Sequence, residues 1–317
     1  GVTTLAEDIR SAKPTILVCV PRVFERVHEK IMAKFSKPVL QQIFQHAMRT
    51  AEHARHSGST SFAGRIYDKV LFHKIREGLG GRLRFAVSGG ASLAQHVAEF
   101  FERLGIVIIE RYGLTETSPV LTMNTLDQHI FGTVGKPLKN VELKISENGE
   151  ILAKGDGLMK GYFKAQDLTE QVIDTDGWFH TGDVGSLDEQ RFLKIVGRLK
   201  EMIVLSTGRN VFPVPIEQEL EESKYVAQAM VYGDNQRAIS AFIVPDFSAL
   251  QEWCTEQGIA YELPQVLEND RVRKLYEDEV TKMLSRMQHF EQVKDFKLLP
   301  QEFTQENDML SAKQSLK

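Results

Sequence analysis

The strongest constraint on the fold is one compact stretch in which a strand, a turn, a helix and a second strand follow one another. "RLRFAVS" reads as a strand, "GGAS" as a turn, and "LAQHVAEFFERLG" has the apolar spacing of an amphipathic helix. The run "IVIIE" then supplies a second strand. Continuously apolar strands joined by a helix predict a mostly parallel sheet buried on both faces, and therefore an α/β fold.

The segment before this unit predicts one more strand and two helices. "PTILVCV" is short and apolar, which indicates a buried strand. From residue 21 to about residue 56 the periodicity predicts one long helix, in which Val23, Val27, Ile31 and Phe35 recur at four-residue spacing. A turn-rich connector, "HSGSTSFAG", leads to a second helix that is expected to end near residue 77.

After Pro119 the chain changes to β-hairpins. "VELKIS-ENG-EILAKG" alternates around an Asn-Gly turn, and "DVGSLDEQRFLKIVG" repeats that pattern. A third hairpin, "VAQAMVYGDNQRAISAFIVPD", precedes a helix, "DRVRKLYEDEVTKMLSRMQ", and a closing strand, "VKDFKLLP". Because this last group looks like a new start, we predict a large domain over 1–197 and a small α+β domain over 198–317.

Composition excludes several classes of protein. A length of 317 residues with 42% apolar content suits two globular domains, and a net charge of −4 disfavours nucleic acid as a partner. Cys19 and Cys254 form no CxxC pattern, so neither a disulfide framework nor a zinc site is indicated, which favours a cytoplasmic location. No apolar run is long enough to span a bilayer, and no signal peptide is visible. Because the chain lacks an initiator Met and begins mid-pattern, we expect a fragment.

Two polar stretches follow the predicted parallel strands. "SGGAS" brings backbone N–H groups close to a ligand without side-chain bulk, although most Gly-Gly turns are only turns. The next strand ends in "ERYGLTETS", where Tyr112 offers a flat face for a base, Thr115 a hydroxyl for phosphate and Glu116 a ligand for Mg²⁺. Because ligands of open α/β sheets bind at the carboxyl ends of strands, these stretches support each other. The alternative is that Thr115 or Thr117 only caps a helix.

Further polar residues lie around the second hairpin. In "DGWFHTGDVG", Asp183 suits a pair of ribose hydroxyls, while His180 is either a catalytic base or a packing residue. Arg198 is either a second contact to ribose or phosphate, or a solvated arginine. In "LSTGRNVFPVPIE", Gly208 permits unusual backbone angles and close approach of a ligand.

These blocks, in this order, resemble the acyl-adenylate-forming superfamily, and within it the long-chain fatty acyl-CoA synthetases. "YGLTE" resembles the adenylate-binding signature, and "GEILAKGDGLMKGYF", "DGWFHTGDVG…FLKIVGRLKEMIVLSTGRNVFPVPIE" and "PTILVCVPRVFERV" resemble other blocks of that family. The resemblance implies ATP-dependent activation of a long-chain fatty acid to acyl-AMP, followed by transfer to coenzyme A, with Mg²⁺ as cofactor.

The resemblance also assigns residues. It implies a nucleotide site formed by Ser88, Gly89, Gly90, Ala91, Glu110, Tyr112, Gly113, Thr115, Asp183 and Arg198. Thr115 would contact the α-phosphate, Glu116 would bind Mg²⁺, Lys200 would be the hinge of the small domain, and Gly208 would line the coenzyme A channel. The family's catalytic lysine falls in "MLSAKQSLK", where we favour Lys313; alignment from Met309 points instead to Ser315, and Lys317 is a third candidate.

Three departures from the family pattern qualify this assignment. The glycine- and hydroxyl-rich pyrophosphate loop expected before "PTILVCVPR" is absent, so we expect this chain alone to be inactive. Arg111 stands where the family often has a smaller residue, and the tail matches the lysine motif only loosely. Alternative functions are acyl transfer to a carrier protein and non-catalytic binding of a nucleotide or acyl group.

The sequence leaves assembly and membrane contact open. Arg22, Arg26, Lys30 and Lys34 form a basic stripe beside the apolar positions of the first long helix. Such a helix either lies peripherally on the inner face of a membrane or presents a solvated edge beside a core-facing stripe. A homodimer is among the possible assemblies.

Overall fold

The computed structural model of the chain describes residues 5–35, 37–57, 59, 61–304 and 307. Contacts divide the chain into two compact units. The first comprises Gly1–Lys144, Leu152–Thr181 and Leu187–Ile195, and the second comprises Ile145–Ile151, Gly182–Ser186 and Val196–Lys317.

The chain contains both helices and strands, as an α/β fold requires. The α-helices are α1 (Leu5–Ala12), α2 (Pro21–Lys34), α3 (Pro38–Ser57), α4 (Phe62–Tyr67), α5 (His73–Gly78), α6 (Gln95–Arg103), α7 (Gln166–Val172), α8 (Pro213–Glu221), α9 (Phe247–Gln257) and α10 (Asp270–Met283). The strands are β1 (Ile16–Cys19), β2 (Phe85–Ser88), β3 (Val107–Tyr112), β4 (Thr122–Met123), β5 (Lys136–Pro137), β6 (Val141–Ile145), β7 (Glu150–Gly155), β8 (Phe179–Leu187), β9 (Leu193–Arg198), β10 (Ile203–Val204), β11 (Asn210–Val211), β12 (Val226–Tyr232), β13 (Ser240–Pro245) and β14 (Asp295–Leu298).

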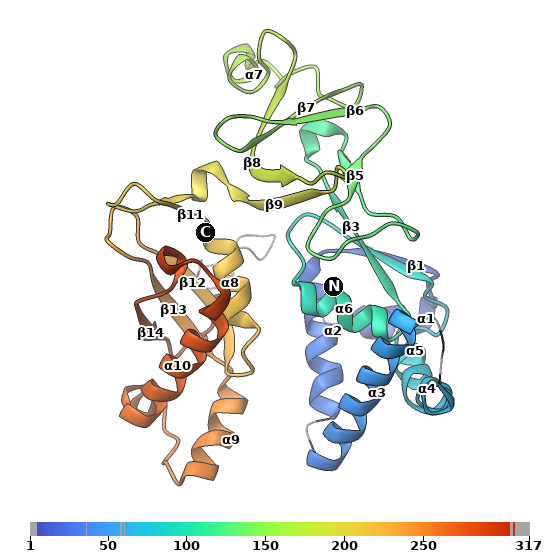
Figure 1. Ribbon diagram of the computed structural model, residues 1–317, viewed down its shortest axis with the longest axis vertical. Coiled ribbons are helices and arrows are strands. Elements are labelled where there is room, and N and C mark those ends of the chain that lie inside the picture. Colours follow the sequence, from blue (N-terminus) through green and yellow to red (C-terminus); the bar gives the residue numbers. More distant parts are fainter. Residues whose placement is uncertain (1–4, 36, 58, 60, 305–306, 308–317) are drawn as a thin grey trace. The chain divides into compact units, whose positions relative to one another are not determined.

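The first unit contains a five-stranded sheet in the order β1-β2-β3-β4-β5. Strands β1, β2 and β3 are parallel, and β4 and β5 add to them in antiparallel orientation. Figure 1 shows α2, α3, α5 and α6 on one side of β1 and β3. Apolar residues of α2, α3 and α6 form the core there with Ala86 and Ile108. The predicted mostly parallel sheet with a strand-helix-strand unit is therefore confirmed.

The prediction that the first strand is buried is wrong. In β1 exposed and half-buried side chains alternate: Ile16 and Val18 are 47% and 61% exposed, whereas Leu17 and Cys19 are half-buried. The reason is its position, because β1 is the edge strand of the sheet and, among the described strands, pairs only with β2. An apolar strand at an edge need not be covered on both faces.

The prediction of one helix over residues 21 to 56 is also wrong. Helix α2 ends at Lys34, and α3 begins at Pro38. The N–H groups in the first turn of a helix have no acceptor within the helix, so a proline there costs no hydrogen bond. Proline is therefore a favourable residue at the start of a helix. The later helix, predicted to end near residue 77, consists of α4, a π-helical segment over Asp68–Phe72, and α5.

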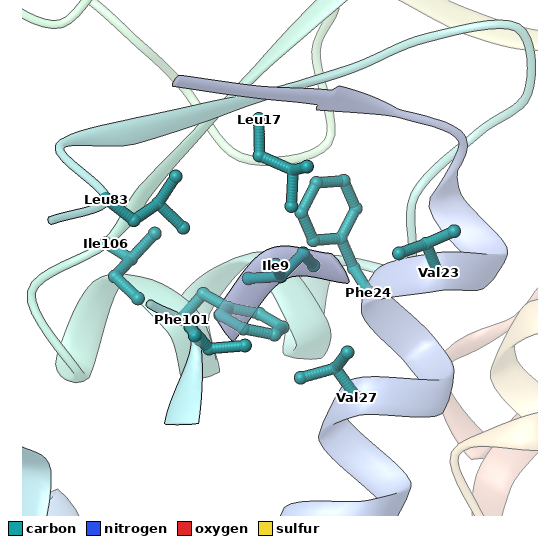
Figure 2. Close-up of a pocket in the computed structure, with 9 residues that line it drawn as sticks. Ile9, Leu17, Val23, Phe24, Val27, Leu83, Phe101 and Ile106 are labelled. Carbon is teal, nitrogen blue, oxygen red and sulfur yellow. The ribbon is translucent and has the colours of Figure 1, made fainter. Parts of the chain in front are cut away.

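Apolar side chains converge beneath β1 around a small pocket, and Figure 2 shows how they lie. Leu17 of β1 points toward Phe24 of α2, with Phe101 of α6 and Ile106 nearby. Every residue that lines this pocket is aliphatic or aromatic. Because it offers no polar group to orient a ligand, we interpret it as a packing gap of the core.

The predicted hairpins are confirmed. Strands β6, β7, β8 and β9 form a four-stranded sheet in that order. In the turn after β6, the N–H of Gly149 donates to the oxygen of Ser146 over 3.0 Å. In the turn after β8, the N–H of Asp188 donates to the oxygen of Phe192 over 3.1 Å.

The second unit contains a three-stranded sheet in the order β12-β13-β14, in which β12 and β13 form the predicted hairpin and β14 is parallel to β13. Helices α8, α9 and α10 contribute to the apolar core of this unit. Two carboxylates of α8 bond to β12: Glu217 accepts from the N–H of Val231 at 2.8 Å, and Glu221 accepts from that of Ala229 at 3.0 Å. No helix among the described residues is long and apolar enough to cross a membrane.

Gly135 offers a test of the first unit's packing. It lies between β4 and β5 at φ +81°, and a Cβ there would stand 1.9 Å from the carbonyl carbon of Met123. An alanine here would have a strained backbone angle, and its Cβ would overlap the backbone of Met123, which no side-chain movement can relieve. Gly135→Ala should therefore lower the free energy of unfolding by about 3 kcal/mol or more. Thermal melting followed by circular dichroism measures this.

The control is Gly78→Ala in α5, where a Cβ meets no atom within 4 Å. Alanine is the better helix former by about 1 kcal/mol, so this variant should melt no lower than the wild type. Equal melting of both variants would contradict the described path of the chain at Gly135.

Candidate active site

The polar residues that follow β2 and β3 lie side by side. Ser88 is the last residue of β2. Strand β2 is parallel to β3, and in their register Ser88 pairs with Glu110. The loop Gly89, Gly90, Ala91 continues from Ser88, with Gly90 at φ +92° in open space. The structure thus brings both predicted stretches to the same edge of the sheet.

Two buried polar atoms here lack a hydrogen-bond partner among the described residues. They are the hydroxyl of Ser88, whose residue is 1% exposed, and Nε of Arg111. The Arg111 side chain lies against Gly89, where a Cβ would stand 3.0 Å from Arg111 Cγ. Because buried polar groups are nearly always paired, unpaired ones at a strand end favour a ligand site. Arg111 thus packs over the predicted glycine loop. The sequence indicated it only as a departure from the family pattern.

Glu110 is the buried carboxyl group of this edge. It is 6% exposed, and burial raises its pKa from 4.5 to about 7, although a hydrogen bond from the backbone of Leu93 opposes the shift. Tyr112 is 8% exposed, so only a small part of its ring is open to a base.

The turn after β3 is compact. At Gly113 a Cβ would lie 1.7 Å from the carbonyl oxygen of Pro119, so only glycine fits. Thr115–Thr117 form a single 3-10 turn, and the Thr117 hydroxyl accepts the N–H of Leu114 over 2.9 Å. The N-cap residue of this turn is Leu114 and Thr117 is its last residue, so neither Thr115 nor Thr117 is the N-cap that the alternative requires. Thr115 is exposed, so its hydroxyl is accessible to a ligand.

Glu116 has a partner that the sequence did not suggest. The hydroxyl of Tyr162 donates to Glu116 Oε1 over 3.1 Å, although 46 residues separate them. The second carboxylate oxygen, Oε2, accepts no hydrogen bond from the described residues. No sequence signal pointed to Tyr162 beyond its place in the block "GLMKGYF".

Asp183 and Arg198 form an ion pair. Asp183 lies on β8 and is 5% exposed, and Arg198 ends β9 with Nε 2.9 Å from Asp183 Oδ1. Beside them Glu150, also buried, accepts the N–H of Gly182 over 3.0 Å. Glu150 was not among the predicted residues, although its hydrogen bond holds the backbone next to Asp183.

The remaining predicted residues are dispersed. Lys200 is exposed in a 3-10 turn after β9, and Gly208 turns between β10 and β11 at φ +76° with no atom near its Cβ position. His180 has Nε2 3.8 Å from Asp174 Oδ2, so an acidic neighbour accompanies it. Lys313 lies outside the described residues.

A magnesium site here would need ligands beyond the protein. Within the described residues, no group of three or more His, Cys, Asp or Glu side chains could hold a metal ion. Mg²⁺ usually takes one or two carboxylates and completes its shell with phosphate oxygens and water. A half-buried Glu116 with one oxygen unengaged fits that requirement.

Comparison with known families identifies the chain. The model of the AMP-binding enzyme family matches residues 2–163, and that of the AMP-binding enzyme C-terminal domain matches residues 200–294. The chain belongs to the AMP-binding enzyme family.

Its relatives include long-chain acyl-CoA synthetases. A long-chain-fatty-acid–CoA ligase of Mycobacterium bovis is 34% identical over 96% of this chain and 52% of its own length. The peroxisomal long chain acyl-CoA synthetase 7 of Arabidopsis thaliana is 33% identical over 98% of this chain and 47% of its own. The chain thus spans about half the length of the curated relatives it matches.

A solved structure agrees on the fold. The adenylation and carrier didomain of a carboxylic acid reductase from Segniliparus rugosus, solved with AMP, aligns with a TM-score of 0.70. It is 24% identical, and the alignment covers 99% of this chain and 41% of that one. The predicted α/β adenylate-forming fold is confirmed.

Glu110 predicts a pH dependence. A carboxyl group whose pKa is raised in the folded protein keeps a proton that the unfolded chain releases, so stability falls as pH rises from about 4.5 to about 7. Glu110→Gln removes this dependence. Across that window the wild type should lose about 3 kcal/mol relative to the variant.

Thermal melting of both proteins between pH 4.5 and 8 measures this difference. The control is Glu147→Gln in the exposed turn after β6, which should follow the wild type throughout. Parallel pH profiles of Glu110→Gln and wild type would show that the pKa of Glu110 is the same in the folded protein as in the unfolded chain, and would contradict the raised pKa.

Proposed function

We propose that this chain is part of a long-chain fatty acid–CoA ligase that forms AMP. The observation that carries the proposal is the edge of the parallel sheet. There the buried Ser88 hydroxyl ends β2 without a hydrogen-bond partner among the described residues, and a glycine loop and Glu116 follow β2 and β3. Supporting it, the Mycobacterium bovis relative whose name states this activity is similar along 96% of the chain.

In the proposed first step a fatty carboxylate oxygen attacks the α-phosphorus of ATP. The new bond makes the acyl-AMP anhydride, and the bond to pyrophosphate breaks. The Thr115 hydroxyl donates to an α-phosphate oxygen, and Glu116 is the residue that would hold Mg²⁺. When bound, Mg²⁺ would offset the negative charge that gathers on the phosphate oxygens.

Asp183 is the proposed ribose contact. Its carboxylate accepts hydrogen bonds from the ribose hydroxyls, and the ion pair with Arg198 orients it. The loop from Ser88 to Ala91, with Glu110, Tyr112 and Gly113, borders the adenine and the acyl carboxyl group.

In the proposed second step the thiolate of coenzyme A attacks the acyl carbonyl carbon, and AMP leaves. We propose a domain boundary between residues 197 and 198; what supports it is that the match to the C-terminal domain family begins at residue 200. Lys200 is then the hinge and Gly208 part of the coenzyme A channel. Lys313 supplies a cation to the first step.

A second candidate acceptor is a carrier protein. The structural relative from Segniliparus rugosus joins its adenylation domain to such a carrier. The two alternatives share the first step and differ only in the thiol that accepts the acyl group. A third alternative, a non-catalytic module, would bind AMP without forming acyl-AMP.

The location that we propose is the cytoplasm, with peripheral contact to a membrane. Free Cys19 and Cys254 suit a reducing compartment. On α2 the predicted basic stripe is partly neutralised, because Arg22 pairs with Glu25 at 3.2 Å. A better contact surface is the exposed apolar row Phe62, Ile66 and Val70, beside Arg65 and Lys69. For the assembly of the chain, a homodimer is our proposal.

The ligase activity is tested with palmitate, ATP and coenzyme A on the longest protein product that contains this sequence. Glu116→Ala should lower kcat for acyl-AMP formation by about 10²- to 10³-fold, because Mg²⁺ placement is lost. Glu147→Ala, in the exposed turn after β6, is the control and should retain full activity. If the protein binds AMP but forms no acyl-AMP, the result favours the non-catalytic module. If the acyl group is transferred only to a carrier protein, CoA ligase activity is excluded.

The membrane contact is tested by co-sedimentation with anionic vesicles. Changing Phe62, Ile66 and Val70 together to serine should weaken binding at least about 10-fold, since these side chains are 80%, 46% and 57% exposed and would enter the lipid. Val39→Ser with Leu40→Ser, two exposed apolar positions on α3, is the matched control. Equal loss in both variants would mean that no particular face binds the vesicle.

A further inference from the structure

The segment after β7 contacts the Glu116 turn at two points. The N–H of Met159 donates to the carbonyl oxygen of Glu116 over 2.7 Å, and the Tyr162 hydroxyl donates to Glu116 Oε1 over 3.1 Å. One short segment therefore holds both the backbone and the carboxylate of the same residue.

The close approach between this segment and the turn depends on glycine. At Gly157 a Cβ would stand 2.9 Å from the carbonyl oxygen of Thr117. Any larger residue would push the segment away from the turn, and the Tyr162 hydroxyl with it. The contact is thus built into the path of the backbone.

Tyr162 is also anchored on its other side. Its N–H donates to the hydroxyl of Thr169 over 2.9 Å, and its carbonyl oxygen accepts the N–H of Ala165 over 3.2 Å. Thr169 belongs to α7 and is buried, and its hydroxyl also bonds to Ala165 O at 3.0 Å. The phenol group therefore projects from a fixed backbone.

The phenol group of Tyr162 has little part in the core. The residue is 37% exposed, and neighbouring Phe163 is 89% exposed. What the hydroxyl provides is one hydrogen bond to one carboxylate oxygen.

We propose that Tyr162 is a positioning residue that holds Glu116 Oε1, so that Oε2 is presented to Mg²⁺; this rests on the proposed function of Glu116. A free glutamate loses rotamer freedom when it binds a metal ion, whereas a carboxylate already held by a hydrogen bond loses less. Partners of metal-binding carboxylates commonly alter metal affinity by about 10- to 100-fold when they are removed.

The test is Tyr162→Phe, read out by Mn²⁺ binding to the chain in the presence of AMP, followed by electron paramagnetic resonance. Mn²⁺ replaces Mg²⁺ as the probe. We expect Mn²⁺ affinity to fall about 10-fold, while AMP affinity without metal and the melting temperature stay at wild-type values. The matched control is Tyr67→Phe, which removes a hydroxyl that lies 3.0 Å from His46 Nδ1 in the same unit, and it should change neither affinity.

A second variant, Glu116→Gln, separates the two proposals. If Glu116→Gln weakens Mn²⁺ binding while Tyr162→Phe does not, the positioning role is overturned and the metal role of Glu116 stands. If Glu116→Gln leaves Mn²⁺ binding unchanged, both are overturned. If Tyr162→Phe lowers the melting temperature and AMP affinity together with Mn²⁺ affinity, Tyr162 is a structural residue and the positioning role is overturned.

Discussion

The parallel pairing of β2 with β3 is the constraint on which the candidate site depends. Parallel strands end at the same edge, so the register that sets Ser88 opposite Glu110 also sets the glycine loop beside the turn that carries Glu116. A helix must connect such strands, and α6 does so with four buried apolar residues. The site is thus a consequence of how the core is connected.

Much of this arrangement follows from local sequence. Continuous apolar runs predicted β2 and β3, and the Asn148-Gly149 turn predicted the hairpin of β6 and β7, because each signal is complete within a few residues. The order of polar blocks then pointed to the family. Each of these signals lies within a short stretch of consecutive residues.

The sequence did not predict features that depend on distant neighbours. The exposure of Ile16 and Val18 depends on the edge position of β1, which no local pattern encodes. The break before Pro38 was missed because apolar spacing continues through it and proline is compatible with a helix start. The Tyr162 hydrogen bond joins residues 46 positions apart, and a propensity says nothing about such a contact.

The glutamates of α8 have a consequence for how the second unit behaves among other copies of itself. Strand β12 is an edge of its sheet, and edge N–H groups invite pairing with a foreign strand. At Ala229 and Val231 those donors are already taken by Glu221 and Glu217. A strand from a second molecule would have to displace two carboxylates before it could add here. The helix therefore protects the sheet against edge-to-edge aggregation.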